Sequence, residues 1–235
     1  MILDTTPPVA LAVFAHPDDP EIACAGSIAR WSSAGCDAHL VIANLGEKGS
    51  LDARADGRAL AAQRASEADA AAAVMGMVSH ELWGIPDGEV ENTAELRARL
   101  VATIRRIRPS VVIAPDPTAV FFGDGYVNHH DHRALGWAVL DAVAPMAAHP
   151  LYFPDTGDSH QVGTLLLAGT LEPDTWVDIE KQLDTKVAAV RCHASQLGDG
   201  VEVVPEVVAA RAADAGRAAG LRYAEGFRRI SFATS

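Results

Sequence analysis

Short apolar runs alternate with longer segments of helical periodicity over the first two thirds of the chain, and few folds satisfy this order. The expected strands are residues 9–14, 39–45, 81–85 and 111–114, and the expected helices are 21–33, 58–75, 94–107 and 130–143. Such alternation predicts a mostly parallel sheet with helices on both faces. We therefore expect a three-layer, doubly wound, Rossmann-like α/β fold with strand order 3-2-1-4-5.

The last third of the chain is less regular. Residues 164–168 and 176–179 have the pattern of strands, and two helices follow them. The chain has 235 residues, 49% hydrophobic and 21% charged, which is enough apolar material for one core. Because no internal repeat or linker divides it, we predict a single domain over residues 1–235.

Charge and cysteine content narrow the choice of partners and compartment. The formal net charge is −12, with no basic stripe, so a nucleic-acid partner is not expected. The three cysteines, an odd number without a CxxC pair, are typical of a reducing compartment. The N-terminal apolar run is too short for a membrane span and lacks a preceding basic region. We expect a cytoplasmic protein without a membrane partner, and a homo-oligomer is possible.

Two polar clusters follow two of the expected strands. His16-Pro17-Asp18-Asp19 comes directly after the first strand, and His129-His130-Asp131-His132 lies in the loop after the fourth. In the order 3-2-1-4-5 these strands are neighbours where the winding reverses, and ligands bind beyond the carboxyl ends of such strands. The sequence therefore predicts that both clusters meet at one edge of the sheet.

The residue types in these clusters suit a hydrolytic metal site. Such a site needs three His or carboxylate ligands and one open position for water, and seven side chains in the clusters are candidates. The metal lowers the pKa of water to about 7, and a neighbouring carboxylate can then accept the proton. Zinc is the expected metal, although sites built from His and carboxylate ligands also accept Fe²⁺.

Other interpretations of the same residues remain open. Asp18 and Asp19 could cap a helix, and the second cluster could be a solvated loop. Phosphoester hydrolysis at two metals could recruit Asp116, but no further Asp/His pair follows a strand. A non-catalytic protein that binds a metabolite is a third reading. Serine nucleophiles and dinucleotides are disfavoured because no Gly-x-Ser-x-Gly or Gly-x-Gly-x-x-Gly motif occurs at the expected places.

Six short motifs in order carry a resemblance to a known family. They are Ala15-His16-Pro17-Asp18-Asp19-Pro20-Glu21, Gly46-Glu47-Lys48-Gly49, Arg64-x-x-Glu67, Gly84-Ile85-Pro86-Asp87-Gly88, His129-x-Asp131-His132 and His193-Ala194-Ser195-Gln196, with Ala224-Glu225-Gly226-Phe227-Arg228 near the end. The chain resembles the N-acetylglucosaminyl-phosphatidylinositol de-N-acetylases, the PIG-L or LmbE-like family. The resemblance implies a zinc-dependent N-deacetylase that hydrolyses a linear amide.

The resemblance also implies roles for individual residues. His16, Asp19 and His132 correspond to the metal ligands, and Asp18 to the general base. A charged His129 would stabilise the oxyanion. Either Asp18 or His129 would protonate the leaving amine.

Further residues would surround this centre. Asp131 would orient a histidine. Arg64 is similar to an arginine that contacts the substrate, although an ion pair with Glu67 on the same helix is an equal alternative. Glu47 and Asp87 would lie at the rim.

Substrate recognition is the least defined part of the resemblance. Some sugar deacetylases of the family carry a tyrosine two residues before the first histidine, whereas Tyr126 stands three before His129. Its role at the oxyanion is therefore open. The expected substrate is an acylated amine: an N-acetyl amino sugar, a sugar conjugate or an acylated natural-product intermediate of secondary metabolism.

Overall fold

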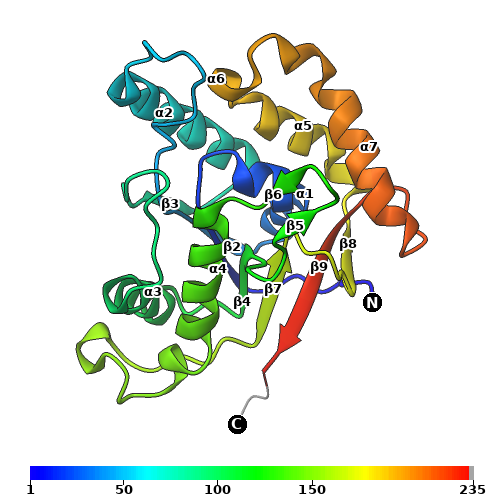
Figure 1. Ribbon diagram of the computed structural model, residues 1–235. Coiled ribbons are helices and arrows are strands. Elements are labelled where there is room, and N and C mark those ends of the chain that lie inside the picture. Colours follow the sequence, from blue (N-terminus) through cyan, green and yellow to red (C-terminus); the bar gives the residue numbers. More distant parts are fainter. Residues whose placement is uncertain (233–235) are drawn as a thin grey trace.

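A seven-stranded sheet runs through the protein in the order β3-β2-β1-β4-β7-β9-β8 (Figure 1). It is seen in a computed structural model that describes residues 1–232. The first five strands in this order are parallel: β3 (Ser79–Leu82), β2 (Asp37–Ile42), β1 (Val9–Phe14), β4 (Val111–Pro115) and β7 (Thr164–Ala168). Because β7 is the fifth strand of this sheet along the chain, the predicted order 3-2-1-4-5 is confirmed.

The strands are buried on both faces, as a parallel sheet requires. Along β1, Leu11 and Val13 contribute to one apolar core, and Ala10, Ala12 and Phe14 contribute to the other. This alternation follows from the period of two in a strand, which sends successive side chains to opposite faces. The two cores are therefore separated by the sheet.

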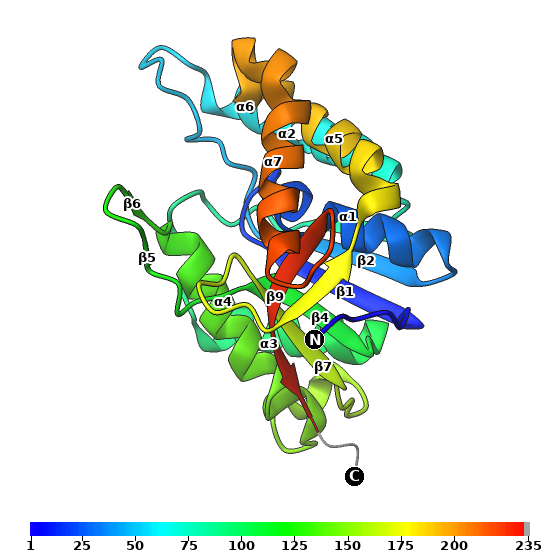
Figure 2. The same ribbon diagram turned by 90° about the vertical axis from the view of Figure 1, so that its right-hand side faces the viewer.

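Helices cover both faces (Figures 1 and 2). On one side lie α3 (Ala94–Ile107) and α4 (His130–Val143), and on the other lie α1 (Asp19–Ser33), α2 (Gly57–Met75), α5 (Leu183–Arg191) and α7 (Val204–Arg217). These are the three layers that the sequence predicts. No helix within residues 1–232 combines the length and apolar character that crossing a membrane would require.

Strand β9 (Ala224–Ser231) differs most from the expected pattern. It pairs antiparallel with both β7 and β8 (Thr175–Asp178), and thus separates two strands that follow each other in the chain. Its sequence contains Gly226 and two consecutive arginines, which do not read as a buried strand. A second departure is the hairpin of β5 (Phe121–Phe122) and β6 (Tyr126–Val127), which precedes α4.

A buried ion pair ties β9 to α1. Lys186 on α5 and Glu225 on β9 lie 2.5 Å apart and are 5% exposed each. Glu225 accepts hydrogen bonds from the backbone N–H groups of Gly26 and Ser27, and Lys186 donates to the carbonyl of Ile22. The pair therefore fixes the helix whose first residue, Asp19, belongs to the site described below.

Replacing Glu225 by alanine should strongly destabilise the protein. Glu225→Ala leaves the buried Lys186 cation without its counter-charge and removes an acceptor of two buried backbone N–H groups, which costs about 3–5 kcal/mol of unfolding free energy. Urea unfolding measures this. The exposed pair Arg217–Asp214 provides the control, because Asp214→Ala should change the free energy of unfolding by less than about 1 kcal/mol. Equal losses in the two variants would contradict the assignment.

Candidate active site

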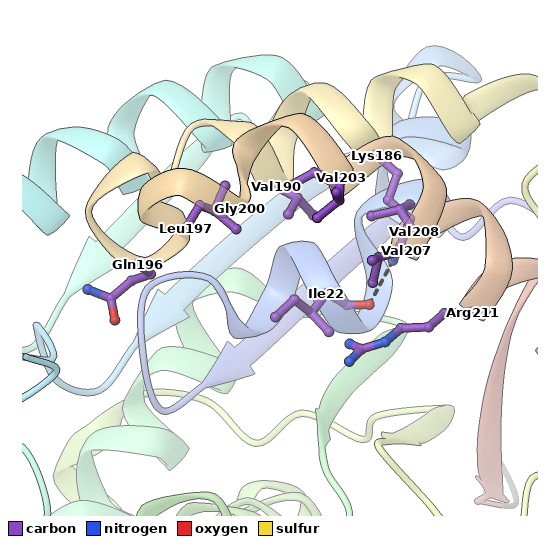
Figure 3. A pocket seen from close by; sticks show the side chains of 11 residues that line it. Ile22, Lys186, Val190, Gln196, Leu197, Gly200, Val203, Val207, Val208 and Arg211 are labelled. Atoms are coloured by element: carbon purple, nitrogen blue, oxygen red, sulfur yellow. Dashed lines mark hydrogen bonds between the residues drawn. The ribbon is translucent and has the colours of Figure 1, made fainter. Parts of the chain in front are cut away.

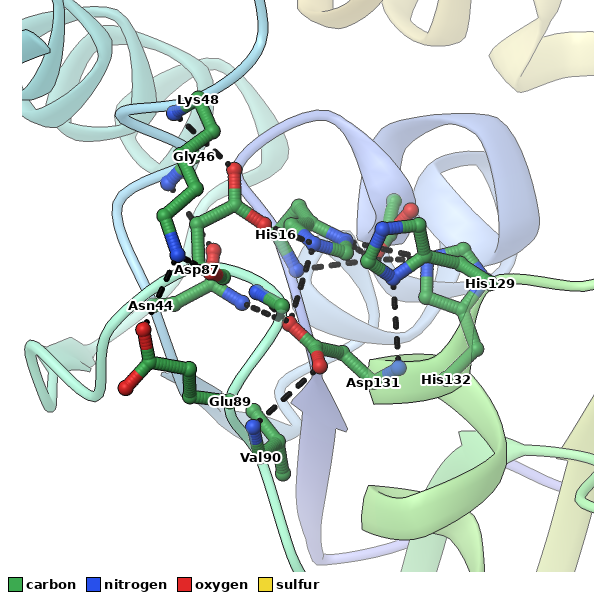
Figure 4. A network of polar contacts seen from close by, with 12 residues as sticks. His16, Asn44, Gly46, Lys48, Asp87, Glu89, Val90, His129, Asp131 and His132 are labelled. Carbon is green, nitrogen blue, oxygen red and sulfur yellow. Dashed lines mark hydrogen bonds and ion pairs between the residues drawn. The ribbon is translucent and has the colours of Figure 1, made fainter.

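The two polar clusters meet at the carboxyl ends of β1 and β4. His16 and Asp19 lie just beyond β1 and at the start of α1, while His129 and His132 lie at the start of α4. The ring centroids of His16 and His129 are 4.7 Å apart, and those of His16 and His132 are 5.1 Å apart. Figure 4 shows the three imidazoles gathered beside Asp131. This is the convergence that the order of the strands predicts.

Three potential ligand atoms converge here: Nδ1 of His16, Oδ2 of Asp19 and Nε2 of His132. The two nitrogen atoms are 3.0 Å apart, and the oxygen lies 3.3 Å from His16 Nδ1 and 3.1 Å from His132 Nε2. Ligands of a tetrahedral zinc at ordinary bond lengths are about 3.3–3.6 Å apart. The triangle is therefore close to one face of a tetrahedral zinc site.

The outer partners of the two histidines favour tautomers in which, when the rings are neutral, both converging nitrogens can act as metal ligands. His16 Nε2 lies 3.2 Å from Oδ1 of Asp87, and His132 Nδ1 lies 3.0 Å from Oδ1 of Asn128. Since these oxygens only accept hydrogen bonds, the protons of the neutral rings lie on His16 Nε2 and His132 Nδ1. When both rings are neutral, the lone pairs of His16 Nδ1 and His132 Nε2 and the Asp19 carboxylate oxygen therefore point toward the same position. A divalent metal ion fits this donor set.

Electrostatics point to the same requirement for positive charge. Burial alone would lower the pKa of His16, but hydrogen bonds with Asp131, Asp19 and Asp87 raise it to about 12. Burial would likewise raise the pKa of Asp19, whereas His132 and His16 bring it far below its usual range. The carboxylates around His16 therefore stabilise a cation at this position, whether a proton or a metal.

Asp18 occupies a strained position beside the ligands. Its φ is 97° and its ψ is −30°, a region that favours glycine. It stands at the N-cap of α1, but its side chain caps no backbone N–H, so the capping alternative does not hold for this residue. Burial, followed by the charge of Asp19, raises its pKa to about 7. A carboxyl group with this pKa can accept and return a proton near neutral pH.

Arg64 holds the backbone around Asp18. Its guanidinium donates to the carbonyls of Pro17 at 2.5 Å and Gly46 at 3.2 Å, and lies 3.3 Å from Oδ1 of Asp18. Only 3% of Arg64 is exposed. The alternative ion pair with Glu67 is not formed, because Glu67 accepts hydrogen bonds from Ser195. At Gly46, with φ +62°, a Cβ would lie 2.2 Å from Arg64 Nη1, so a larger residue would displace the guanidinium.

Asp87 and Glu47 form a chain of contacts that ends at His16. Oδ1 of Asp87 contacts His16 Nε2, Oδ2 accepts from the backbone N–H of Lys48 at 3.1 Å, and the backbone N–H of Asp87 donates to Glu47 at 2.8 Å. Asp87 is 6% exposed. The structure therefore places Asp87 against a candidate ligand, further inside than the rim where the sequence suggested it.

Asp131 connects three segments around the site. Its completely buried carboxylate accepts hydrogen bonds from Asn44 at 3.0 Å, Gly88 at 2.8 Å and Val90 at 3.2 Å. Oδ2 also lies 3.5 Å from His16 Nε2. These contacts agree with a role in orienting a histidine, and they join the loops after β2 and β3 to α4.

His129 is held in its neutral form. Its Nδ1 accepts a hydrogen bond from the backbone N–H of Asp131 at 3.2 Å, which caps α4 and leaves the ring proton on Nε2. Burial, followed by the charge of His16, lowers its pKa. The resemblance suggested a charged His129; the geometry instead favours a neutral imidazole that can still donate one hydrogen bond.

Tyr126 lies on the hairpin at the mouth of the site. It is 54% exposed, and it lines the same hollow as His16, Asp18 and His132. Its ring centroid is 5.9 Å from that of Phe122 on the opposite strand. The hairpin therefore brings Tyr126 to the site even though its spacing from His129 departs from the family pattern.

Residues to which the sequence analysis assigned no role also surround the site. Glu21 and His193 are 0% and 1% exposed, and the His193 ring nitrogen Nε2 lies 3.2 Å from the Glu21 carboxylate. Gln196 lines the hollow beside Asp18. His193 and Gln196 both belong to the motif His193-Ala194-Ser195-Gln196, and this motif was the sequence feature that could have indicated their place at the site.

Comparisons with known proteins agree with this geometry. The family model for the PIG-L GlcNAc-PI de-N-acetylases matches residues 11–143. Diacetylchitobiose deacetylase of Thermococcus kodakarensis is 31% identical over 222 residues, which cover 93% of this chain and 81% of the relative. A probable N-acetyl-α-D-glucosaminyl L-malate deacetylase 2 of Bacillus anthracis is 29% identical over 81% of this chain and 82% of its own length.

Solved structures show the same fold. N,N′-diacetylchitobiose deacetylase of Pyrococcus horikoshii superposes with a TM-score of 0.86 at 28% identity, over 96% of this chain and 84% of that one. The 4-carboxy-2-hydroxymuconate hydratase of Pseudomonas putida superposes with a TM-score of 0.79 at 25% identity, over 97% and 98%.

Fold and site together define an α/β protein with a candidate His/Asp metal site at the switch point of its sheet. The chain belongs to the PIG-L family of de-N-acetylases.

Removing the outer partner of His132 should weaken metal binding. Asn128→Ala removes the acceptor that keeps the proton on Nδ1, and loss of such a partner typically costs about 10- to 100-fold in affinity. Competition with a chromogenic zinc chelator measures the affinity. Asn128→Asp, which keeps an acceptor oxygen, should retain most of it. Asn92→Ala serves as the control, because Asn92 donates its hydrogen bond to Asp141 on α4 and contacts none of the candidate ligands. An unchanged affinity in folded Asn128→Ala protein would show that this contact is irrelevant.

Proposed function

We propose that this protein is a metal-dependent N-deacylase that hydrolyses the amide of an acylated amino sugar, sugar conjugate or natural-product intermediate. The observation that carries the proposal is the convergence of three potential ligand atoms, two ring nitrogens and a carboxylate oxygen, beside the Asp18 carboxyl group. Deacetylases among the relatives support the type of bond.

His16, Asp19 and His132 would hold the metal, with zinc as the proposed ion and Fe²⁺ as an acceptable substitute. When bound, the metal would polarise the amide carbonyl and lower the pKa of water to about 7. The chain's own part is to keep both histidines in the ligating tautomer, through Asp87 and Asn128.

Asp18 would accept the proton from the attacking water. Arg64 and the strained backbone hold its carboxylate in place, and its raised pKa suits a base that works near neutral pH. His129, neutral with its proton on Nε2, would donate a hydrogen bond to the developing oxyanion. Because neutral His129 would have to become an anion to give up this proton, Asp18 is the better donor to the leaving amine.

The amino-sugar part of the substrate would lie in the polar hollow of about 410 Å³ that contains Asp18, Lys48, Arg64 and His129. The charged side chains that line this hollow can form hydrogen bonds with the hydroxyl groups of a sugar. Tyr126, exposed at the rim, would contact the substrate directly. Arg64, Glu47 and Asp87 would act mainly by holding the catalytic loops, because each already has partners within the protein.

The neighbouring aspartates provide the sharpest test. Asp18→Asn should lower the kcat for acetate release from N-acetylglucosamine derivatives by at least about 100-fold while zinc remains bound, because only the base is lost. Asp19→Asn should lose both activity and metal, since a ligand is changed. Metal content by elemental analysis and acetate release distinguish the two variants. Full activity in Asp18→Asn would refute Asp18 as the base.

A substrate panel separates the alternatives. The proposal expects acetate from N-acetyl sugars and no hydrolysis of p-nitrophenyl phosphate, whereas a phosphoesterase shows the reverse. Zinc binding without turnover of any N-acyl amine would favour a metabolite-binding protein. Because a hydratase shares the fold, the panel includes a 2-hydroxymuconate-type unsaturated acid, whose hydration would point to that chemistry instead.

A further inference from the structure

The candidate ligands stand between two hollows of different character. The polar hollow of about 410 Å³ lies on one side, and a larger hollow of about 620 Å³ lies on the other. Asp19, Tyr126 and His132 line both. The walls of the larger one are mainly apolar: Phe14, Ile22, Ala23, Pro115, Phe122 and Ala168. An amide held at the metal would therefore extend one half into each hollow.

The position of the proton donor decides which half goes where. Asp18, the proposed proton donor to the leaving amine, lines the polar hollow and does not line the apolar one. The nitrogen of the amide must approach Asp18 for the C–N bond to break. The amine half therefore faces the polar hollow, and the acyl half faces the apolar hollow.

The apolar hollow is far larger than an acetyl group needs, and a further cavity lies next to it. This third cavity, of about 330 Å³, lies between α1, α5 and α7 (Figure 3). Ile22 and Arg211 line both it and the apolar hollow, so the two spaces meet at these side chains. Val190, Leu197, Val203 and Val207 provide much of its wall.

We propose that this enzyme accepts N-acyl groups longer than acetyl, with the acyl chain lying along the apolar hollow and ending in the cavity beside α7. The inference rests on the proposed amide hydrolysis and adds the chemical class of the acyl group.

The apolar hollow and the cavity beside α7, together the proposed acyl path, expose apolar side chains that a hydrocarbon chain can cover. Ile22, Val203 and Val207 are 48%, 51% and 44% exposed, which leaves apolar surface for an acyl chain to cover. Lys186 also borders the cavity, but its ammonium is engaged by Glu225 and by two carbonyls of α1. The aliphatic stem of Arg211 can lie against the chain while its guanidinium stays in water.

The test compares N-acetyl-, N-butanoyl-, N-hexanoyl- and N-octanoylglucosamine, with release of the free amine as readout. Each methylene buried from water contributes up to about 4-fold in binding. Allowing for the partly open path, we expect kcat/KM to be at least about 30-fold higher for octanoyl than for acetyl. Val207→Asp, which places a charge in the cavity, should bring this octanoyl-to-acetyl ratio close to one.

Val74→Asp is the matched control, because Val74 is a valine of similar exposure, 38%, on helix α2 and lines none of the three spaces. It should keep the ratio of the parent protein. Comparing ratios within each variant cancels any general loss of activity. A ratio near one in the parent protein, with acetyl hydrolysed, overturns the proposal. So does a rise in kcat/KM with the length of an alkyl aglycone of N-acetylglucosamine instead of the acyl chain.

Failure of the proposed function gives a different result. If no N-acylglucosamine is hydrolysed, amide hydrolysis of these sugars is refuted, and calorimetry with the Asp18→Asn protein tests the acyl path by itself. Tighter binding of N-octanoylglucosamine than of N-acetylglucosamine, lost in the double variant with Val207→Asp, supports the path. Equal binding of the two compounds overturns it.

Discussion

The meeting of two imidazole lone pairs and a carboxylate oxygen is the constraint on which the site depends. The converging lone pairs of His16, Asp19 and His132 would repel one another if nothing lay between them, and either a proton on His16 or a metal ion relieves this repulsion. The fold provides for that cation: adjacent parallel strands bring the two clusters together, and Asp87 and Asn128 impose the tautomers. Much of the surrounding hydrogen bonding keeps these few atoms in place.

The architecture and the meeting of the two polar clusters could be predicted because both follow from local rules. Strand–helix alternation determines the parallel sheet, and neighbouring strands must deliver His16 and His132 to one edge. The partners of Arg64 were harder to predict, because its long side chain can reach several groups and only the folded structure determines which of them it contacts. Strand β9 was not predicted, because its glycine and two arginines interrupt the run of apolar residues that is typical of a buried strand. The Glu21–His193 contact joins residues far apart in sequence, with no periodic signal.

Sharing a fold does not determine which bond is broken. A hydratase and a deacetylase both superpose closely on this chain, so the same sheet can support different reactions. What distinguishes such proteins is the space around the metal position. Here Asp18 and His129 line the polar hollow, and neither of them lines the apolar hollow. This division is a property of side chains at the rim, which vary independently of the core.

The backbone at Asp18 has a consequence for how this protein can evolve. At φ 97° a glycine would sit without strain, whereas any side chain costs about 1–3 kcal/mol of folding free energy. Selection for thermal robustness alone would therefore remove the carboxylate, and only selection for turnover retains it. An Asp18→Gly protein that melts at a higher temperature but is inactive would show that stability and activity place opposite demands on this residue. Stability and activity thus compete at a single residue.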